Sequence, residues 1–550
     1  MFATTIKKAT SMKRLLPLAC AALGALLSAA AQAAAPGITG PTFNLTAQTA
    51  YLTQPDGLSV YSWGYGCNGA PSGFAPTAIS GAACSTMQVP GPTLIVTEGQ
   101  TVTVNLTNNL PTAAGNTSIL FPGFNVTPSG AGAVQGLLTT EAAPGGTVTY
   151  TFTASSPGTR AYYSGTQGDL QVEMGLYGAI IVLPASPPAV CTAGLPATNP
   201  GGNTAARGTW GEADFRLAAA AYDHPDTCYD REYLFQFSEM DPNIHIQALA
   251  QVTAIANCTT GVAGNTCPTT LNVPTEPYHP VYYLINGRSM PDDMDPNYAA
   301  QYPHQPYNGN PHMHPGELTL LRIIGQGRWQ HPFHEHGNHV RILGRDGNLI
   351  LSNSTITYPG ATGAFQALAG PLLFTTTTTP GLAMDGIFYW SGKGLNWDAY
   401  GHNPASAAAS TDPVHAPCVA DANGYNTGAT GAINYFEWCQ DHNKPLQAKP
   451  FGDVAAGGPA TLPDANLFTN GAWYGGSPYL GPDATVRATG PTGSTPPSGT
   501  IANSPTGEAG FAFMWHSHNE REITTNNIFP GGMLMMMLVD SREFVIDESN

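Results

Sequence analysis

Apolar and polar residues alternate through much of the first third of the chain, as they do in strands with one buried face. In the segment 88–105 the alternation runs on both sides of Glu98 and Gly99, which predicts two strands joined by a hairpin-like turn. Residues 148–153 alternate in the same way, and residues 175–182 form an apolar strand. We therefore expect an all-β sandwich over about residues 42–183.

A second set of strand patterns spans about residues 232–545 and predicts a second sandwich. The expected strands are 233–237, 282–288, 318–324, 339–343, 372–376, 386–390, 510–515 and 533–539. Residues 396–505 are rich in Gly, Ala, Pro and Asn and show few alternations, so we interpret them as a surface insertion rather than a third domain. The predicted fold class is all-β, with two sandwich domains and a long loop-rich insertion in the second.

The N-terminus has the order of a secretory signal peptide. Four basic residues between positions 7 and 14 precede an apolar run at 15–27 and a small-residue end, Ala31-Gln32-Ala33. We expect residues 1–33 to be removed and the mature protein to be periplasmic or secreted. A lipid anchor on Cys20 is the disfavoured alternative, because the apolar run continues well past that cysteine. No later stretch approaches the roughly 20 apolar residues of a membrane helix, so no membrane span is expected.

The net negative charge of the chain restricts the kinds of molecule that it can bind. The formal net charge is -17 and becomes -21 without residues 1–33, with 15 basic against 36 acidic residues. Such a balance repels nucleic acids and anionic membranes and favours cationic partners, metal ions included. The 63 glycines and 48 prolines suit short strands with many turns.

Eight cysteines remain after the signal peptide, an even number in an exported chain, which predicts disulfide bonds. Their spacing suggests pairing between neighbours, although eight cysteines allow 105 connectivities. The expected pairs are Cys67 with Cys84, Cys191 with Cys228, Cys258 with Cys267 and Cys418 with Cys439.

Histidines concentrate at two places in the second predicted domain. The segment His331-Pro-Phe-His334-Glu-His336-Gly-Asn-His339 is followed much later by His516-Ser-His518 at the end of a predicted strand. Residues i and i+2 of a strand face the same way, so each His-x-His pair presents two imidazoles on one side. Imidazole binds Cu, Zn, Ni and Fe. Two such pairs predict a metal site.

These motifs together resemble the multicopper oxidases, the family that contains laccases and ascorbate oxidase, over most of the chain outside 396–505. In the first domain the resemblance is carried by residues 90–93, 99–105 and 175–182, and in the second by residues 315–322, 331–336, 516–518 and 532–533. The resemblance implies two cupredoxin-like Greek-key β-sandwich domains. It also implies copper as the cofactor, held by the His-x-x-His-x-His and final His-x-His motifs.

The chain departs from the family's pattern at several ligand positions. Residues 117–123 and 162–165 stand where the first domain of the family carries histidine ligands, and neither segment contains a histidine. In the final motif Ser517 replaces the copper-binding cysteine, and Glu522 replaces a later histidine. A blue copper centre needs a thiolate and two imidazoles, so we expect no such centre.

The expected metal ligands are therefore His334, His336, His516 and His518, with His331 as a further candidate, and no catalytic residue is predicted. Together with the expected signal peptide, the resemblance implies an exported copper-binding protein that works as a copper-dependent oxidoreductase with a reduced, histidine-only site. The alternatives are a non-catalytic periplasmic copper-binding or buffering protein, and a structural cupredoxin protein. Copper ions are the expected partner, and the electron donor is unassigned. Two-domain members of the family often assemble through their domain interfaces, so a homo-oligomer is also compatible with the resemblance.

Other candidates carry less weight. His312 and His314 lie in a Pro-rich segment that we expect to be an exposed loop, together with His304, with weak copper capture as the alternative. Four methionines at 533–537 alternate along a predicted strand, which favours core packing over metal binding. Tyr162 and Tyr163 stand where ligand histidines are lost, and we expect them to fill the vacated volume rather than bind metal.

Overall fold

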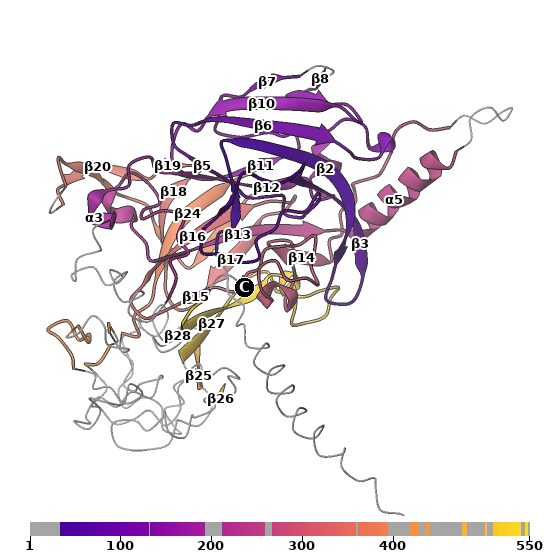
Figure 1. Ribbon diagram of the computed structural model, residues 1–550. Helices are drawn as coiled ribbons and strands as arrows, with labels where there is room; N and C mark the ends of the chain where they lie inside the picture. Colours follow the sequence, from indigo (N-terminus) through magenta and orange to yellow (C-terminus); the bar gives the residue numbers. More distant parts are fainter. Residues whose placement is uncertain are drawn as a thin grey trace, which may run out of the picture.

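The computed structural model describes twelve segments of the chain, which hold two β-sandwiches (Figure 1). The described residues are 34–130, 133–192, 212–258, 267–358, 361–393, 419–427, 435–436, 438–440, 476–480, 501–502, 510–540 and 545–547. The expected signal peptide, Cys418 and most of the expected insertion lie outside these ranges. No helix within them is both long and apolar enough to cross a membrane.

The first sandwich has two five-stranded sheets. One sheet has the order β11 (Gly158–Tyr163), β12 (Tyr177–Leu183), β5 (Leu94–Thr97), β1 (Gly37–Thr39) and β4 (Phe74–Ala75). The other has the order β3 (Ser59–Cys67), β2 (Thr42–Thr53), β6 (Thr101–Asn108), β10 (Thr147–Thr153) and β7 (Thr127–Ser129). A small hairpin of β8 (Ala133–Gln135) and β9 (Thr140–Ala142) and the short helix α2 (Gly168–Gln171) lie beside them.

The expected hairpin around Glu98 and Gly99 is wrong, although both of its strands are present. β5 pairs in parallel with β12, whereas β6 pairs with β2 and β10 in the other sheet. The chain crosses between the sheets at Gly99, whose φ of 82° favours glycine. Alternation predicts a strand but not its partner, so it cannot distinguish a hairpin from a crossing between two sheets.

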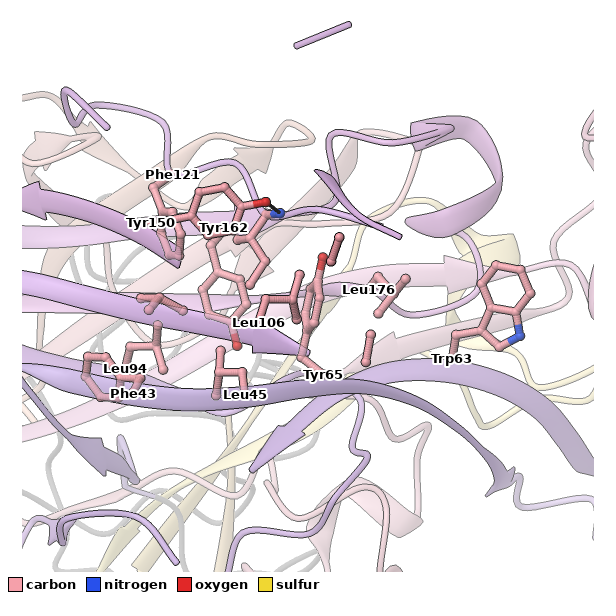
Figure 2. Close-up of a cluster of buried hydrophobic side chains, with 14 of the residues drawn as sticks. Phe43, Leu45, Trp63, Tyr65, Leu94, Leu106, Phe121, Tyr150, Tyr162 and Leu176 are labelled. Carbon is pink, nitrogen blue, oxygen red and sulfur yellow. Dashed lines mark hydrogen bonds between the residues drawn. The ribbon is translucent and has the colours of Figure 1, made fainter. Parts of the chain in front are cut away.

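Aromatic and aliphatic side chains fill the space between these two sheets (Figure 2). Tyr162 on β11 is fully buried there, in ring contact with Phe121 and Tyr65, and its hydroxyl donates a hydrogen bond to the Pro92 carbonyl at 2.7 Å. Tyr162 is therefore a core residue, as expected.

The second sandwich has two larger sheets. One has the order β14 (Tyr282–Ile285), β13 (Arg231–Met240), β16 (Leu318–Gly325), β24 (Ala383–Tyr389), β18 (Val340–Arg345) and β19 (Asn348–Leu349), with β22 (Leu372–Leu373) on β18. The other has the order β15 (His312–Met313), β28 (Leu534–Asp540), β27 (Gly510–Ser517), β17 (His331–Glu335) and β23 (Thr375–Thr378). β25 (Gly476–Leu480) pairs with β27 and with β26 (Ile501–Ala502), and β20 (Leu351–Ile356) and β21 (Phe365–Leu368) form a separate hairpin.

The core of the second sandwich confirms the packing role of the methionine strand. Met533, Met535 and Met537 are fully buried in this core together with Trp515. Met536 points to the other face of β28 and is half-buried. The alternation predicted from the sequence thus places three of the four sulfurs in the core.

One long helix lies outside the strand patterns. α5 (Pro242–Ala256) begins after Asp241, whose side chain accepts a hydrogen bond from the Asn243 amide, and proline occupies the first turn. Ile244, His245 and Ala248 are its buried residues, and the helix packs against β3 of the first sandwich (Figure 1). The helix directly follows β13 and thereby ties the second sandwich to the first.

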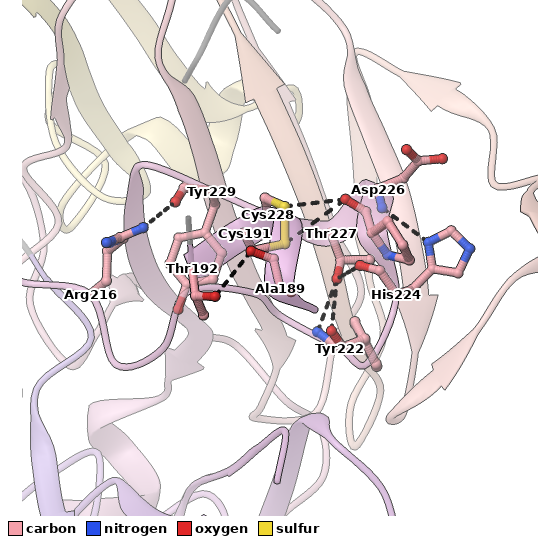
Figure 3. Close-up of a disulfide and its surroundings, with 11 residues drawn as sticks. Ala189, Cys191, Thr192, Arg216, Tyr222, His224, Asp226, Thr227, Cys228 and Tyr229 are labelled. Atoms are coloured by element: carbon pink, nitrogen blue, oxygen red, sulfur yellow. Dashed lines mark hydrogen bonds between the residues drawn. A yellow bond between two sulfur atoms is a disulfide. The ribbon is translucent and has the colours of Figure 1, made fainter. Parts of the chain in front are cut away.

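Three of the four expected disulfides are present: Cys67–Cys84, Cys191–Cys228 and Cys258–Cys267. Cys439 is also disulfide-bonded, while its expected partner Cys418 lies outside the described residues. The Cys191–Cys228 bridge joins helix α3 (Ala189–Thr192) to the segment before β13 (Figure 3). It therefore links the two ends of the connection between the sandwiches.

Polar contacts also join the sandwiches. Asp385 on β24 accepts hydrogen bonds from the backbone N–H of Thr159 on β11 at 3.0 Å and from its hydroxyl at 2.6 Å. The proposed domain limits at 42, 183, 232 and 545 remain predictions; β1 lies before the first of them.

Candidate copper site

Two neighbouring strands bring the two His-x-His motifs together. β17 and β27 run antiparallel, with His334 directly opposite His516. Opposite residues of an antiparallel pair point to the same face, and residues two positions further along do so too. His336 and His518 follow immediately after the ends of β17 and β27. Sheet pairing thus gathers all four histidines that the sequence indicated.

The four rings form one cluster. The centroid of the His334 ring lies 4.8 Å from that of His518, 4.9 Å from that of His336 and 5.5 Å from that of His516. His336 and His516 are 5.1 Å apart by the same measure, and His516 and His518 are 5.9 Å apart. His334 and His516 are buried, His336 is half-buried and His518 is exposed, so the cluster opens to solvent on one side.

Hydrogen bonds orient two of the rings. Nδ1 of His516 lies 2.6 Å from the Ser517 carbonyl oxygen, which only accepts, so Nδ1 carries a proton. In the neutral imidazole the free lone pair is then on Nε2. Nδ1 of His334 lies 2.7 Å from the Thr375 hydroxyl. Partners of this kind commonly fix the orientation of metal-binding imidazoles.

The surroundings keep these imidazoles uncharged near neutral pH. Burial, helped by the neighbouring His336, His516 and His518, lowers the pKa of His334 to about 4. Burial also lowers the pKa of His516. A metal ion binds neutral imidazole, so neither ring needs to lose a charge before it binds.

The cluster fits a metal ion at one pair of atoms in particular. Nε2 of His336 and Nε2 of His516 are 3.2 Å apart. Two imidazole nitrogens that bind one ion at about 2.0 Å in a tetrahedral arrangement are about 3.3 Å apart. The donor set contains imidazoles only, which suits copper, zinc and nickel better than calcium or magnesium. These residues therefore fit the copper ion that the motifs imply.

His331 is placed differently from the other candidates. Its Nε2 lies 2.9 Å from Oε2 of Glu239, and its Nδ1 lies 2.9 Å from Oε2 of Glu522. Burial lowers the pKa of His331, but the two carboxylates outweigh it and raise that pKa to about 9. The ring is then an imidazolium that donates both protons, with no lone pair for a metal.

The two residues that depart from the family's final motif belong to the same network. The Ser517 hydroxyl donates to Oε2 of Glu522 at 2.5 Å, and the side-chain amide of Asn519 donates to Oε1 at 2.9 Å. Charged and polar groups here satisfy one another at the positions where the resemblance would lead one to expect blue copper ligands. The sequence pointed to His331, Ser517 and Glu522 but gave no sign of Glu239, which comes from β13, about ninety residues earlier.

Glu335, between the two ligand candidates of β17, is a second residue that sequence reasoning missed. It points to the opposite face of the strand, where one carboxyl oxygen accepts from the Thr376 hydroxyl at 2.6 Å. Burial raises its pKa to about 8, so it is neutral at pH 7. It does not add charge to the histidine cluster.

The expectation of an exposed loop around His312 and His314 is wrong. Both side chains are buried. Nδ1 of His312 lies 2.6 Å from Oδ2 of Asp540, and Nδ1 of His314 lies 2.9 Å from the Asp540 carbonyl. β15 pairs with β28, which draws this polar segment into the sheet edge. His304 is half-buried, with Nδ1 at 2.8 Å from the Met87 carbonyl.

His314 also lies close to the carboxylates of Glu212 and Glu317, and the possible donor atoms of these three buried residues all lie within 4.8 Å of one another. The guanidinium of Arg231 binds both carboxylates at 2.5 Å. A cation is thus already present there, and the group is an ion-pair cluster.

Residues 81–187 match the family model described as multicopper oxidase. Solved structures similar to this chain include a multicopper oxidase named mgLAC (14% identity, TM-score 0.39) and a blue copper oxidase from Nitrosomonas europaea (15% identity, TM-score 0.40); each alignment covers 90% of this chain and 85% of the other. A copper nitrite reductase from Nitrosomonas europaea is similar at 18% identity and a TM-score of 0.34, over 64% of this chain and 84% of that one. No curated protein sequence matches.

Proposed function

We propose that this chain, whose first sandwich carries the multicopper oxidase match, is an exported copper-binding protein and a copper-dependent oxidoreductase with a histidine-only site. The ligands are His334, His336, His516 and His518. Export to the periplasm or the medium rests on the signal-peptide pattern of residues 1–33.

One observation carries the proposal: the convergence of both His-x-His pairs, with the Nε2 atoms of His336 and His516 3.2 Å apart. The ring nitrogens of His331 are enclosed by two carboxylates, which leave no place for an ion. The Nε2 atoms of His336 and His516 face each other within hydrogen-bond distance, which is also the spacing of two nitrogens on one ion.

Copper supplies the one-electron redox change in this scheme. The chain's own residues hold and orient it: the Ser517 carbonyl fixes the His516 ring and the Thr375 hydroxyl fixes the His334 ring. The exposed His518 leaves one side of the site accessible to a small reductant or to dioxygen. Electrons reach the site directly, because Ser517 provides no thiolate for a blue copper centre.

The second candidate is a copper-binding or buffering protein without turnover. It is favoured by the acidic charge of -17 and by the lack of a cysteine in the final motif. The two functions share the same ligands and differ only in whether the bound copper takes part in a reaction.

Metal analysis and oxygen consumption on one preparation separate the candidates. The mature protein is loaded with Cu(II), dialysed and assayed in an oxygen electrode with ascorbate as the reductant. The oxidoreductase binds copper tightly and consumes oxygen; His336→Ala removes both, and His304→Ala, outside the cluster, keeps both. Tight copper without oxygen uptake supports buffering, and no tight copper contradicts both functions.

A further inference from the structure

A cavity of about 280 Å³ lies between the two sandwiches. On the first sandwich its walls come from Leu120, from Leu138 in the β8–β9 turn, and from the segment 163–172. On the second they come from Gln326 and Gly327 after β16 and from Pro380 and Gly381 before β24. The proposed copper ligands take no part in this cavity.

The cavity is lined by the segments of the first domain that lack the histidines of the family's pattern. Leu120 belongs to the 117–123 segment and Gly165 to the 162–165 segment. The two segments pair, with the Leu120 amide donating to the Tyr163 carbonyl at 2.8 Å. Positions that carry metal ligands in the resembled family here line a cavity large enough for a small organic molecule.

Two glycines of the cavity walls, Gly165 and Gly327, have no room for a side chain. A Cβ added at Gly165 would lie 2.8 Å from the Leu120 side chain, and one at Gly327 would lie 2.4 Å from Oε2 of Glu239. A Cβ at Gly168, which lines the cavity, would meet nothing within 4 Å, so a larger side chain there would extend into open space rather than into packed protein. Side chains of neighbouring residues thus pack closely against these wall segments, while the cavity itself contains no side chain of the described residues.

Two polar groups are available on the walls. The side-chain nitrogen of Gln326 donates to the Gly178 carbonyl at 2.9 Å and to the Gln236 side-chain oxygen at 3.1 Å. Both amide hydrogens are used, which leaves the Gln326 oxygen as an acceptor. The Tyr163 hydroxyl has no hydrogen-bond partner in the described part of the chain. A bound molecule thus meets one acceptor and one group that donates.

The absence of charged residues on the described cavity walls favours an uncharged ligand. None of the described residues that line the cavity is charged, and the charge that acts on the lining residue Tyr163 is the carboxylate of Asp346. Leu120, Leu138, Val172 and Pro380 provide apolar surface. Ligand pockets commonly combine apolar walls with a few polar groups that fix the orientation of the ligand.

We propose that this cavity binds a small uncharged cyclic alcohol, with its ring against Leu120, Val172 and Pro380 and its hydroxyl between Gln326 and Tyr163. The volume equals that of about nine liquid waters, which is room for one molecule of about ten non-hydrogen atoms. The hydroxyl donates to the Gln326 oxygen and accepts from the Tyr163 hydroxyl. A carboxylate is excluded, because no cation lies on the walls to compensate its desolvation. This site is independent of the proposed copper function.

The test measures the binding of 4-fluorobenzyl alcohol, the probe, to the copper-free mature protein by fluorine NMR. The probe should bind with a dissociation constant below about 1 mM, and 4-fluorobenzoate, which has the same ring but a charge, at least tenfold more weakly. Gly168→Phe should weaken binding at least tenfold by occupying the space. Tyr163→Phe, which keeps the shape and removes the hydroxyl, should weaken it severalfold.

Leu351→Ala is the matched control, since it alters an exposed leucine on β20, away from the cavity. It should leave the binding curve unchanged, and circular dichroism shows whether each variant is folded. The proposal is overturned if folded Gly168→Phe binds the alcohol like the wild type, if Tyr163→Phe has full affinity, or if the benzoate binds as well as the alcohol.

Discussion

Nε2 of His336 and Nε2 of His516 face each other at 3.2 Å, although the residues are 180 positions apart in the sequence. The antiparallel pairing of β17 with β27 creates this proximity, since it sets His334 opposite His516. Without an ion, one nitrogen donates a hydrogen bond to the other. With an ion, both lone pairs point at the metal. The strand register therefore decides whether the site exists.

Removing the imidazole of His312 should destabilise the protein and leave its copper content unchanged. His312→Ala removes the buried imidazole whose Nδ1 lies 2.6 Å from Oδ2 of Asp540. Loss of a buried hydrogen bond costs about 1 to 3 kcal/mol. Urea unfolding followed by circular dichroism measures the loss, and metal analysis provides the second readout. An unchanged unfolding midpoint would show that the pair is energetically unimportant.

Stability should fall as the pH rises through 9. The pKa of His331 in the folded protein is about 9, above its ordinary value of 6.5. A raised pKa stabilises the fold fully below about pH 6.5, and this stabilisation disappears as the pH rises through 9, by about 3 kcal/mol in all. Urea unfolding at pH 6, 7.5 and 9.5 measures it.

The variant His331→Gln isolates this effect from other titrations. It should be less stable than the wild type at pH 6 and should lack the wild-type slope between pH 6.5 and 9.5. His304→Gln, which removes a half-buried histidine elsewhere, should keep that slope. A wild-type slope retained in His331→Gln would mean that another group is responsible.

Mass spectrometry of the unreduced mature protein should find no free thiol. Three bridges and a fourth bonded cysteine account for seven of the eight cysteines. The Cys191–Cys228 bridge spans 37 residues and the Cys258–Cys267 bridge spans 9. By loop-closure entropy, removing the longer one as a Cys→Ser pair should cost about 1 kcal/mol more. Two or more free thiols would contradict the pairing.

The copper-loaded protein should lack the strong visible band of a copper–thiolate bond. Ser517 offers a hydroxyl, and the described cysteines are in disulfides. The double variant Ser517→Cys, Glu522→His should gain that band. Oε2 of Glu522 contacts both Nδ1 of His331 and the Ser517 hydroxyl, so the new thiolate and imidazole would lie beside His331. Ser517→Cys alone, which keeps the Glu522 carboxylate on His331, is the control. A band in the wild type would refute the disulfide assignment.

The strands and the shared face within each His-x-His pair were predictable because both depend on local periodicity, whereas the meeting of the two pairs was expected only from the resemblance to the multicopper oxidases. Alternation located the strands around 94–104 and 510–539, and the i, i+2 rule placed each His-x-His pair on one face. Pairing between distant strands was not predictable in this way. The mistaken hairpin at Gly99 and the buried position of His312 both result from partners that alternation does not encode.

The network around His331 shows a second limit. Sequence comparison with the family's motif identified Ser517 and Glu522 as departures, but their consequence depended on Glu239. That residue comes from β13, and only the folded structure brings it to 2.9 Å from His331. The role of His331, the further candidate beside the four expected ligands, was therefore undecided until the partners of its ring nitrogens were visible.

Copper titration of the wild type, His336→Ala and His516→Ala, with circular dichroism to verify folding, tests the histidine-only site most directly. The wild type should saturate at one, or at most two, tightly bound ions per chain, because residues 117–123 and 162–165 contain no histidine to complete a three-copper cluster. Each alanine variant should remain folded and lose tight binding. Three tight ions per chain, or full binding by His516→Ala, would contradict the account.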